Sequence, residues 1–440
     1  MSNHREPREP RELIYLHFGA IARRAASAAI LALALTILLT GLTPTAQGQT
    51  YSVIYTFTGG PDGAYPSTGL TMDAAGHLYG TAFSGGTAGM GTVFFLSNNG
   101  GAWTFQPLHS FSGGPDGAGP LAQLVIGPDG ALYGSTTAGG GGPCMGSNGY
   151  LGCGTVYKLR PPMSAPASAI HNWSTTVLYS FSGNDGQYPQ GELTFDQTGN
   201  IYGTTVTGGS SNWGEIYRLT PSSGGWTENT LYSAQGNGDG KFPWGGVVFD
   251  SAGNLYGGFT ENGPYGYGAL FELKPSGSGW RESTIHGFRF IEDDGAIPQG
   301  GLTRDSAGNL YGTTAHSLNG GGTVFKLVPS GGAWSYNFLY GLSGGIDVGP
   351  YGKLLMDAAG NLYGTTMGDG QYGYGSVFKL TPSSGGWIYT SLHDFTGGSD
   401  GGDPICTLVM DSSGNLYGTA SLGGAGFGVN GWGVVFRITP

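Results

Sequence analysis

Three carboxylic acids and one histidine in glycine-rich stretches of this chain have the chemistry needed for acid–base catalysis. The acids are Glu215, Glu261 and Asp369, and His316 can act as a general base near neutral pH. Cleavage of a glycosidic bond typically uses two carboxyl groups about 5–9 Å apart, so this set is compatible with a glycosidase or a polysaccharide lyase. The sequence contains no phosphate-binding loop and no His-Glu-x-x-His motif. An enzyme is therefore the alternative interpretation, and a ligand-binding or scaffold protein without catalysis is the favoured one.

Aromatic residues in the same kind of stretch have the chemistry of carbohydrate binding. Aromatic rings stack against the C–H faces of sugars, and neighbouring Asn and Asp side chains bond sugar hydroxyl groups. Asn212, Asn262, Asp369 and Asn430 are such neighbours. The alternative is that the rings fill gaps between loops. The candidate ligand-binding residues are Trp213, Trp244, Tyr265, Tyr267, Tyr372, Tyr374 and Trp432.

The three cysteines predict one disulfide bond. Cys144 and Cys153 lie nine residues apart and enclose a glycine-rich segment that can turn back on itself. Two free thiols are the alternative for this pair. Cys406 lies in a strand-like stretch and is expected to stay free and buried. The spacing of the three does not suggest a zinc site.

An acidic series recurs along the chain, and most of its members precede a glycine. The main interpretation is turn formation, because Asp side chains accept hydrogen bonds from nearby backbone amides. If all members encircled one axis, their combined charge could hold a calcium ion, and no other cofactor is expected. The series is Asp62, Asp116, Asp185, Asp239, Asp294, Asp347 and Asp400.

All these residues belong to a unit that occurs seven times. Its clearest phrase is Asp-Ser-Ala-Gly-Asn-Leu-Tyr-Gly at 250–257, and the tyrosines of successive units are 54, 69, 54, 55, 52 and 54 residues apart. The Asp of the phrase is expected to clasp a hairpin turn, with the Gly three residues later in a left-handed conformation. A period of this length is typical of repeat architectures. The tyrosines are Tyr79, Tyr133, Tyr202, Tyr256, Tyr311, Tyr363 and Tyr417.

Each unit contains four strand-like runs, which are separated by Gly, Pro, Asn and Asp; the unit starting at Gly245 shows them over 246–249, 254–259, 269–273 and 280–288. The prediction is an all-β, seven-bladed β-propeller with four antiparallel strands per blade, strand A nearest the axis and strand D outermost. Six tryptophans that begin the D strands, together with the repeating tyrosines, are expected to pack between blades. A linear β-solenoid is the alternative.

The two ends of the repeat region complement each other. Residues 51–57 match the fourth strand of a unit, while residues 434–439 form a third strand that no fourth strand follows. Pairing these two segments closes the ring and removes the exposed edges of an open array.

In a propeller, the loops joining strands B to C and strands D to A emerge on the same face. Trp213 and Trp432 fall in B–C loops and Trp244 falls in a D–A loop, so the candidate aromatic residues are predicted to share this face. Blades three and four contribute one group, and blades six and seven contribute another. Function on a symmetric scaffold is expected where the symmetry is broken.

The phrases at 305–314 (DSAGNLYGTT) and 322–327 (GTVFKL) resemble the Gloeo_Verruco (GloVer) tandem-repeat family of exported bacterial proteins. This resemblance covers roughly residues 51–440, and it implies export but no particular activity. More distantly, the phrase is similar to NHL and gluconolactonase-type propellers, a likeness that implies the fold alone.

The N-terminal segment predicts export. Arg23 and Arg24 precede an apolar run over 25–42, and small residues follow up to a plausible cleavage site after Gly48. Residues 1–49 are therefore read as a signal peptide, or alternatively as an uncleaved membrane anchor, and 50–440 as the propeller. Membrane association is expected only in the second case.

Composition limits the partners. The net charge is −11 and only 10% of the residues are charged, so nothing supplies the basic patch that a nucleic acid requires. The expected protein is secreted or lies at the cell surface, where it acts as a binding or scaffold module for a glycan or another cell-surface component. The alternative is an extracellular polysaccharide lyase or glycosidase that uses loop carboxylates on the same face.

Overall fold

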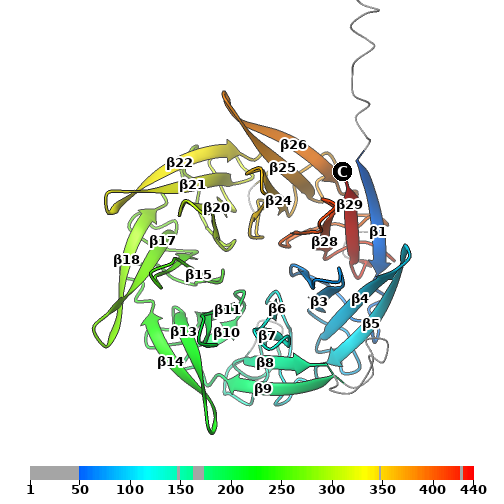
Figure 1. Cartoon of the computed structure of the whole chain (residues 1–440), viewed down its shortest axis with the longest axis horizontal. Coiled ribbons are helices and arrows are strands. Elements are labelled where there is room, and N and C mark those ends of the chain that lie inside the picture. The colour runs from blue at the N-terminus through cyan, green and yellow to red at the C-terminus, as the bar shows by residue number, and fades with distance from the viewer. Residues whose placement is uncertain (1–48, 146–148, 162–172, 346–347, 427–429) are drawn as a thin grey trace, which may run out of the picture. The chain divides into compact units, whose positions relative to one another are not determined.

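The chain forms seven four-stranded antiparallel blades around a common axis (Figure 1). The computed structural model describes residues 49–145, 149–161, 173–345, 348–426 and 430–440, and this part of the chain contains strands and turns but no α-helix. The predicted seven-bladed propeller is confirmed, and the solenoid alternative is wrong.

Strands run from the axis to the rim in the order A, B, C and D in each blade. Blades 1 and 2 consist of β2 (Thr71–Met72), β3 (Leu78–Ala82), β4 (Thr92–Asn99) and β5 (Ala102–Ser110), and of β6 (Val125–Ile126), β7 (Leu132–Thr136), β8 (Thr155–Arg160) and β9 (Ser174–Ser180). Blade 3 consists of β11 (Thr194–Phe195), β12 (Ile201–Thr207), β13 (Glu215–Ser222) and β14 (Gly225–Ser233), with the additional short strand β10 (Gln187–Pro189) paired to the end of β12.

The remaining blades follow the same plan. Blade 4 consists of β15 (Val248–Phe249), β16 (Leu255–Phe259), β17 (Ala269–Ser276) and β18 (Gly279–Gly287). Blade 5 consists of β19 (Thr303–Arg304), β20 (Leu310–Thr314), β21 (Thr323–Ser330) and β22 (Ala333–Gly341). Blade 6 consists of β23 (Leu355–Met356), β24 (Leu362–Thr366), β25 (Ser376–Ser383) and β26 (Gly386–Asp394). Blade 7 consists of β27 (Val409–Met410), β28 (Leu416–Ala420), β29 (Val434–Thr439) and β1 (Thr50–Thr56).

Blade 7 closes the ring with a strand from each end of the repeat region. β1 pairs antiparallel with β29, in a register that runs from Thr50 opposite Thr439 to Thr56 opposite Val434. Figure 1 shows β1 as the outer strand beside β29. The predicted pairing of residues 51–57 with 434–439 is confirmed, and it removes the edge that would otherwise end the array.

The repeated Asp clasps the A–B hairpin, as predicted. In blade 4, the backbone amides of Ala252 and Asn254 donate to Asp250 Oδ1 at 2.8 and 2.9 Å. The Tyr256 hydroxyl donates to Asp250 Oδ2 at 3.1 Å, so the clasp also fixes the repeating tyrosine. Gly253 has φ +83°, a conformation that favours glycine. In blade 2, where Gly127 replaces the Asp, the Tyr133 hydroxyl donates to Asp129 instead, at 3.1 Å.

The hydrophobic core is divided among the contacts between neighbouring blades. One cluster combines Tyr202 of blade 3 with Leu255 and Phe271 of blade 4, and similar clusters surround the ring. Trp334 of blade 5 meets Tyr256 of blade 4 edge to face, with ring centroids 5.4 Å apart. The predicted packing of these repeating tryptophans and tyrosines between blades is therefore confirmed.

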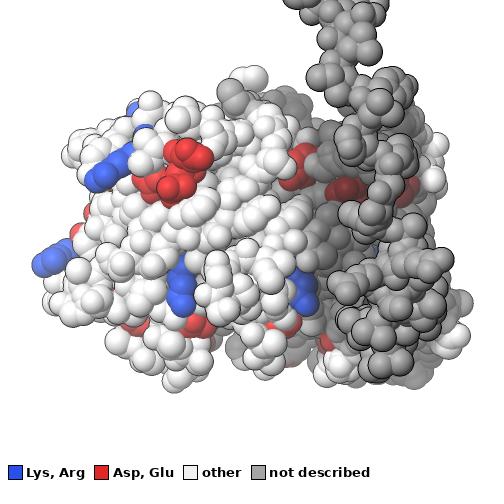
Figure 2. Space-filling model, turned by 90° about the horizontal axis from the view of Figure 1, so that it is seen from above, with Lys and Arg blue, Asp and Glu red and all other residues white. Residues whose placement is uncertain are grey.

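Residues 1–48, which contain the predicted leader, lie outside the described residues. Within the described ranges, no helix is long and apolar enough to cross a membrane. Figure 2 views the ring from its rim, where the Lys and Arg side chains are scattered and several have Asp or Glu side chains close by.

Candidate functional site

The D–A and B–C loops lie on one face of the propeller, as predicted from the strand order. Outside the named strands, single antiparallel residue pairs join the D–A loop that enters a blade to the B–C loop of the same blade. These pairs are Ala64 with Ser84, Ala118 with Ala138, Lys241 with Glu261, Ala296 with His316, and Gly402 with Leu422.

A cavity of about 380 Å³ opens on the axis at this face. Every D–A loop ends in a proline, and the residues that follow the proline form the cavity wall before strand A begins. Because each blade contributes once, the wall contains a ring of seven side chains, of which only the glutamines of blades 3 and 5 are alike. The ring that directly follows the prolines is Ser67, Leu121, Gln190, Trp244, Gln299, Tyr351 and Ile405.

A second ring, two residues further along each unit, holds the charged groups of the cavity wall. Lys353 Nζ of blade 6 lies 3.0 Å from Glu192 Oε2 of blade 3, so the ion pair spans two intervening blades. Those blades carry Gly246 and Gly301 at the same ring position. A Cβ on Gly301 would lie 3.5 Å from Lys353 Cδ, so the lysine stem runs directly past this glycine. The ring is Gly69, Gln123, Glu192, Gly246, Gly301, Lys353 and Thr407.

Trp244 and several side-chain amide groups line this cavity. Trp244 is 39% exposed. Gln299 Oε1 is buried and has no hydrogen-bond partner among the described residues. By contrast, Gln123 Nε2 is fixed by donating to the Leu70 carbonyl at 2.8 Å. The cavity therefore combines the aromatic side chains of Trp244 and Tyr351 with several hydrogen-bond donors and acceptors, as small-molecule sites commonly do.

Of the seven predicted ligand-binding residues, Trp244 lines this cavity and the other six lie in the B–C loops. Four of those six occupy one equivalent position, immediately before the glycine that precedes strand C. The same position holds Met90, Cys153 and Gly321 in the other blades, so these aromatic residues belong to the repeat after all. The four are Trp213, Tyr267, Tyr374 and Trp432.

These four rings contact the D–A loop that enters the next blade. Trp213 meets Phe242 edge to face at 5.5 Å, and Tyr267 stacks on Phe290 at 5.3 Å. Trp432 covers Gly59, where a Cβ would lie 2.5 Å from the indole. Tyr265 and Tyr372 are more exposed, at 51% and 52%, and Arg289 Nη2 donates to the Tyr265 hydroxyl at 2.9 Å. These aromatic rings therefore hold neighbouring loops together on the face where the cavity opens.

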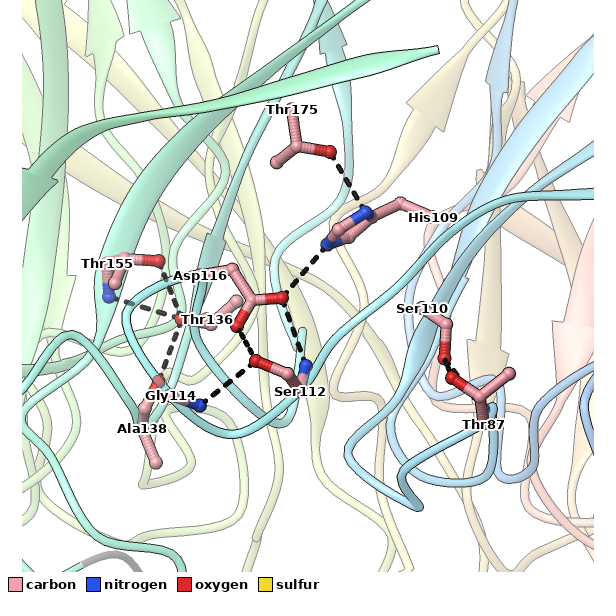
Figure 3. Close-up of polar contacts among 10 residues, drawn as sticks. All are labelled: Thr87, His109, Ser110, Ser112, Gly114, Asp116, Thr136, Ala138, Thr155 and Thr175. Atoms are coloured by element: carbon pink, nitrogen blue, oxygen red, sulfur yellow. Dashed lines mark hydrogen bonds and ion pairs between the residues drawn. The ribbon is translucent and has the colours of Figure 1, made fainter. Parts of the chain in front are cut away.

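The second acidic series closes the D–A loops. Asp116 accepts hydrogen bonds from the Ser112 backbone amide at 3.0 Å and from the Ser112 hydroxyl (Figure 3). His109 Nε2 lies 3.2 Å from Asp116 Oδ2, and His109 Nδ1 lies 2.9 Å from the Thr175 hydroxyl of the next blade (Figure 3). Burial lowers the pKa of His109, although the Asp116 carboxylate opposes this shift.

Equivalent bonds orient the other described members of this series toward a D-strand Tyr or His. Partners of this kind are Tyr55 with Asp62, Tyr179 with Asp185, Tyr232 with Asp239, His286 with Asp294, and His393 with Asp400. Each of these carboxylates and that of Asp116 also accepts a hydrogen bond from a backbone amide at the start of its loop, so turn formation is confirmed for the six described members. Asp347 lies outside the described residues. The described side chains include no group of three or more His, Cys, Asp or Glu arranged as a metal site. Calcium binding stays a prediction.

The carboxylic acids considered for catalysis make their bonds in separate blades. Glu215 is buried and accepts from the Thr230 hydroxyl at 3.3 Å, whereas buried Asp369 accepts from Ser376 at 2.8 Å. Burial raises the pKa of both groups. Glu261 is exposed. None of these bonds brings two of the three acids together in the described part of the chain.

Sequence reasoning missed a carboxyl neighbour of Glu215. The Thr230 hydroxyl, which bonds Glu215, also lies 3.2 Å from Glu228 Oε1. Burial, together with repulsion from Glu215 and Asp185, raises the pKa of Glu228 to about 7. Glu228 lies on β14 at the rim, outside the axial cavity.

Cys144 and Cys153 form a disulfide bond with Cα atoms 4.9 Å apart, and Cys406 is free and buried. The bonded pair lies in the B–C loop of blade 2, and the Cys153 carbonyl accepts from the Tyr188 amide at 3.1 Å. The disulfide therefore stabilises a loop on the same face as the cavity.

Glu192, Lys353, Gln190, Gln299 and Tyr351 are cavity residues that the sequence interpretation did not select. One signal was available. When the seven units are aligned on the proline that ends each D–A loop, the first and third residues after it vary in chemistry, while the fourth is always Leu or Val. Variation at a fixed distance from invariant scaffold residues identifies the positions that face the axis.

Fold and cavity together define a seven-bladed β-propeller with an axial cavity on its D–A loop face. Within this class, the chain belongs to the Gloeobacter/Verrucomicrobia repeat family, whose profile matches residues 40–165, 144–348 and 315–440. No curated protein is significantly similar in sequence.

Solved structures share the fold at low sequence identity. A protein from Bacteroides uniformis assigned as a 6-phosphogluconolactonase is 14% identical, with a TM-score of 0.49 over 80% of this chain and 89% of that one. A polysaccharide lyase, an ulvan lyase solved with a bound saccharide, is 11% identical, with a TM-score of 0.47 over 74% and 86% of the two chains. A protein assigned as a gluconolactonase is 13% identical, with a TM-score of 0.41 over 81% and 97%. These likenesses concern the fold alone.

Proposed function

We propose that this protein is an exported carbohydrate-binding module whose ligand enters the axial cavity from the D–A loop face. The observation that carries the proposal is the exposed Trp244 ring in a cavity that also presents Gln190, Gln299 and the Glu192–Lys353 pair. A sugar offers apolar C–H faces to a ring and hydroxyl groups to amides and charges. The cavity volume of about 380 Å³ lies within the range of small-ligand sites.

The aromatic residues of the B–C loops have a secondary place in this proposal. Tyr265 and Tyr372 are the most exposed of them and can contact parts of a glycan that extend beyond the cavity. Trp213, Tyr267, Tyr374 and Trp432 hold the loops that form the face, and their exposed edges are available to the same ligand. Partners of the protein are therefore glycans or glycosylated cell-surface components.

An extracellular location is part of the proposal. The Cys144–Cys153 disulfide supports it, because such bonds persist mainly in oxidising compartments. The apolar N-terminal run supports it as well.

A glycan array with the purified protein tests the proposal, with turnover of the same polysaccharides measured in parallel. Trp244→Ala is expected to weaken binding at least about tenfold, as loss of a central aromatic contact does. Phe338→Ala is the matched control, because Phe338 is 38% exposed and lies on the outer strand β22. Binding that survives Trp244→Ala, or no binding to any glycan, contradicts the proposal. Turnover of a bound polysaccharide favours the lyase or glycosidase alternative.

A further inference from the structure

The charges that line the axial cavity cancel. Of the described residues in its wall, only Glu192 and Lys353 are charged at neutral pH, and they are paired at 3.0 Å. A charged ligand would have to break this pair or bring an uncompensated charge into a partly closed site, and both are unfavourable. The net charge of −11 also opposes the approach of an anion. The cavity is therefore suited to an uncharged, polar ligand.

The ion pair keeps free hydrogen-bonding capacity. An ammonium group has three donors and a carboxylate has about four acceptor positions, so one mutual bond leaves most of them available. The side chains of Lys353 and Glu192 are 28% and 32% exposed. A hydroxyl group both donates and accepts. Two adjacent hydroxyl groups on a sugar ring can therefore accept one bond from Lys353 and donate one to Glu192 without separating the pair.

Gln299 offers a further hydrogen-bond acceptor to such a ligand. Its Oε1 atom is buried without a partner among the described residues, so turning the amide into the cavity breaks no hydrogen bond of this oxygen. Leaving such an acceptor unpaired costs about 1–3 kcal/mol, and a ligand hydroxyl that reaches it removes that penalty.

The ion pair also limits how far a ligand can enter. Glu192, Lys353, Gln123 and Thr407 line both the Trp244 cavity and a second cavity that extends to Asp357 in the A–B turn of blade 6. The pair therefore stands between the two cavities. A ligand that enters beside Trp244 meets the pair at the inner end of its cavity, and we expect the pair to oppose the passage of a glycan chain.

We infer that the axial cavity binds the terminal residue of a neutral glycan, whose adjacent hydroxyl groups bond Glu192 and Lys353 while Trp244 covers a C–H face. This inference rests on the proposed carbohydrate-binding function and specifies its ligand. It predicts recognition of chain ends rather than chain interiors.

Isothermal titration calorimetry tests the inference with two matched series of oligosaccharides from one to six residues. One series consists of neutral gluco-, manno- and xylo-oligosaccharides, and the other consists of oligogalacturonides. We expect a neutral series to bind, with an affinity that stops increasing by the trisaccharide. Glu192→Gln and Lys353→Met should each weaken that binding at least tenfold. Lys274→Met is the control, because Lys274 forms an ion pair with Glu272 at 2.8 Å that lies outside the cavity.

A double variant that exchanges the two charges controls for the possibility that the single variants fail to fold. The double variant Glu192→Lys with Lys353→Glu keeps an ion pair and should retain neutral binding within about tenfold of the original protein. The inference would be overturned if oligogalacturonides bound more strongly than the neutral series, with binding lost in Lys353→Met and increased in Glu192→Gln. That result would leave the proposed carbohydrate binding intact. An affinity that increases with every added neutral residue would also overturn the inference. The absence of binding in both series counts instead against carbohydrate binding itself.

Discussion

The backbone amide of Phe242 donates a hydrogen bond to the backbone carbonyl of Trp213 at 2.9 Å, and the two rings meet edge to face. Phe242 precedes the proline that leads into blade 4, whereas Trp213 lies in the B–C loop of blade 3, so the contact joins neighbouring blades. Phe242 has φ +58°, an uncommon conformation for a bulky residue. The same bond links Met90 to Gly119, Cys153 to Tyr188, Tyr267 to Ile297, Tyr374 to Asp403, and Trp432 to Tyr65.

Because this link recurs around the ring, Trp213 is expected to contribute mainly to stability. Its ring packs on Phe242, and Lys241 Nζ lies 3.6 Å from the ring centroid. Trp213→Ala should lower the free energy of unfolding by about 1–3 kcal/mol, below the value for a fully buried tryptophan because the ring is only half-buried. Trp244→Ala should leave the free energy of unfolding nearly unchanged. Urea denaturation of both variants measures this, and an unchanged stability combined with weaker glycan binding in Trp213→Ala would instead assign the indole to the ligand.

Ring closure by β1 is expected to dominate the stability of the whole molecule. Deletion of residues 50–56 removes the outer strand of blade 7 and exposes the edge of β29. We expect the free energy of unfolding to decrease by several kcal/mol, which is a large fraction of the stability of a typical domain. Removal of Ser223 and Gly224 from the exposed turn between β13 and β14 is the control and should have little effect. Equal stability of the two deletion variants would show that the ring does not depend on this pairing.

The fold could be predicted from the sequence because its signals are local and occur seven times. The Asp250 clasp, the Gly253 turn and the Tyr256 ring fall within seven successive residues, so one unit already contains their physical cause. Closure could be predicted because the surplus strand at one end matches the deficit at the other.

The site could be predicted only in part, because its contacts are distant along the chain. The strand order placed Trp244 on the correct face. Glu192 and Lys353, however, are separated by 161 positions, and only the closed ring brings blades 3 and 6 within reach of each other. Variable loop lengths also concealed that Trp213 and Trp432 share one position in the repeat. Alignment on the glycine before strand C, rather than on the tyrosine of strand B, makes that equivalence visible.

The glycine that follows the repeating tyrosine is required by close packing and not by its backbone angles. A Cβ on Gly257 would lie 2.5 Å from the Phe271 ring, which is fully buried. Gly257→Ala should therefore lower the free energy of unfolding by about 1–3 kcal/mol through overpacking. Gly224→Ala is the matched control, because no atom lies within 4 Å of its added Cβ. Thermal denaturation compares the two variants, and an equal melting temperature would contradict this account of the repeat.

The disulfide bond is expected to stabilise the B–C loop of blade 2. Cys144→Ser should lower the free energy of unfolding by about 2–3 kcal/mol, the value that the chain-entropy estimate gives for a loop of this length. Chemical denaturation measures the loss. Peptide mapping without reductant should recover the Cys144–Cys153 pair and alkylate Cys406 only after unfolding, because that thiol is buried. Alkylation of Cys144 or Cys153 in the untreated protein would show that the bond is absent.

The carboxyl groups of Glu215 and Glu228, which share the Thr230 hydroxyl, should make the free energy of unfolding depend on pH near neutrality. Burial first, and then repulsion from Glu215 and Asp185, raises the pKa of Glu228 from an ordinary value of 4.5 to about 7. Between these values the folded state binds more protons than the unfolded chain, so the free energy of unfolding must decrease as pH rises from 4.5 to 7 and stay low above it. Glu228→Gln removes this penalty. Because solvent partly screens the carboxyl group, we expect the variant to be more stable at pH 8 by about 1 kcal/mol and equally stable at pH 4. Denaturation curves across this range test the sign, with exposed Glu261→Gln as the control, and a variant that is less stable at pH 8 would refute the assignment.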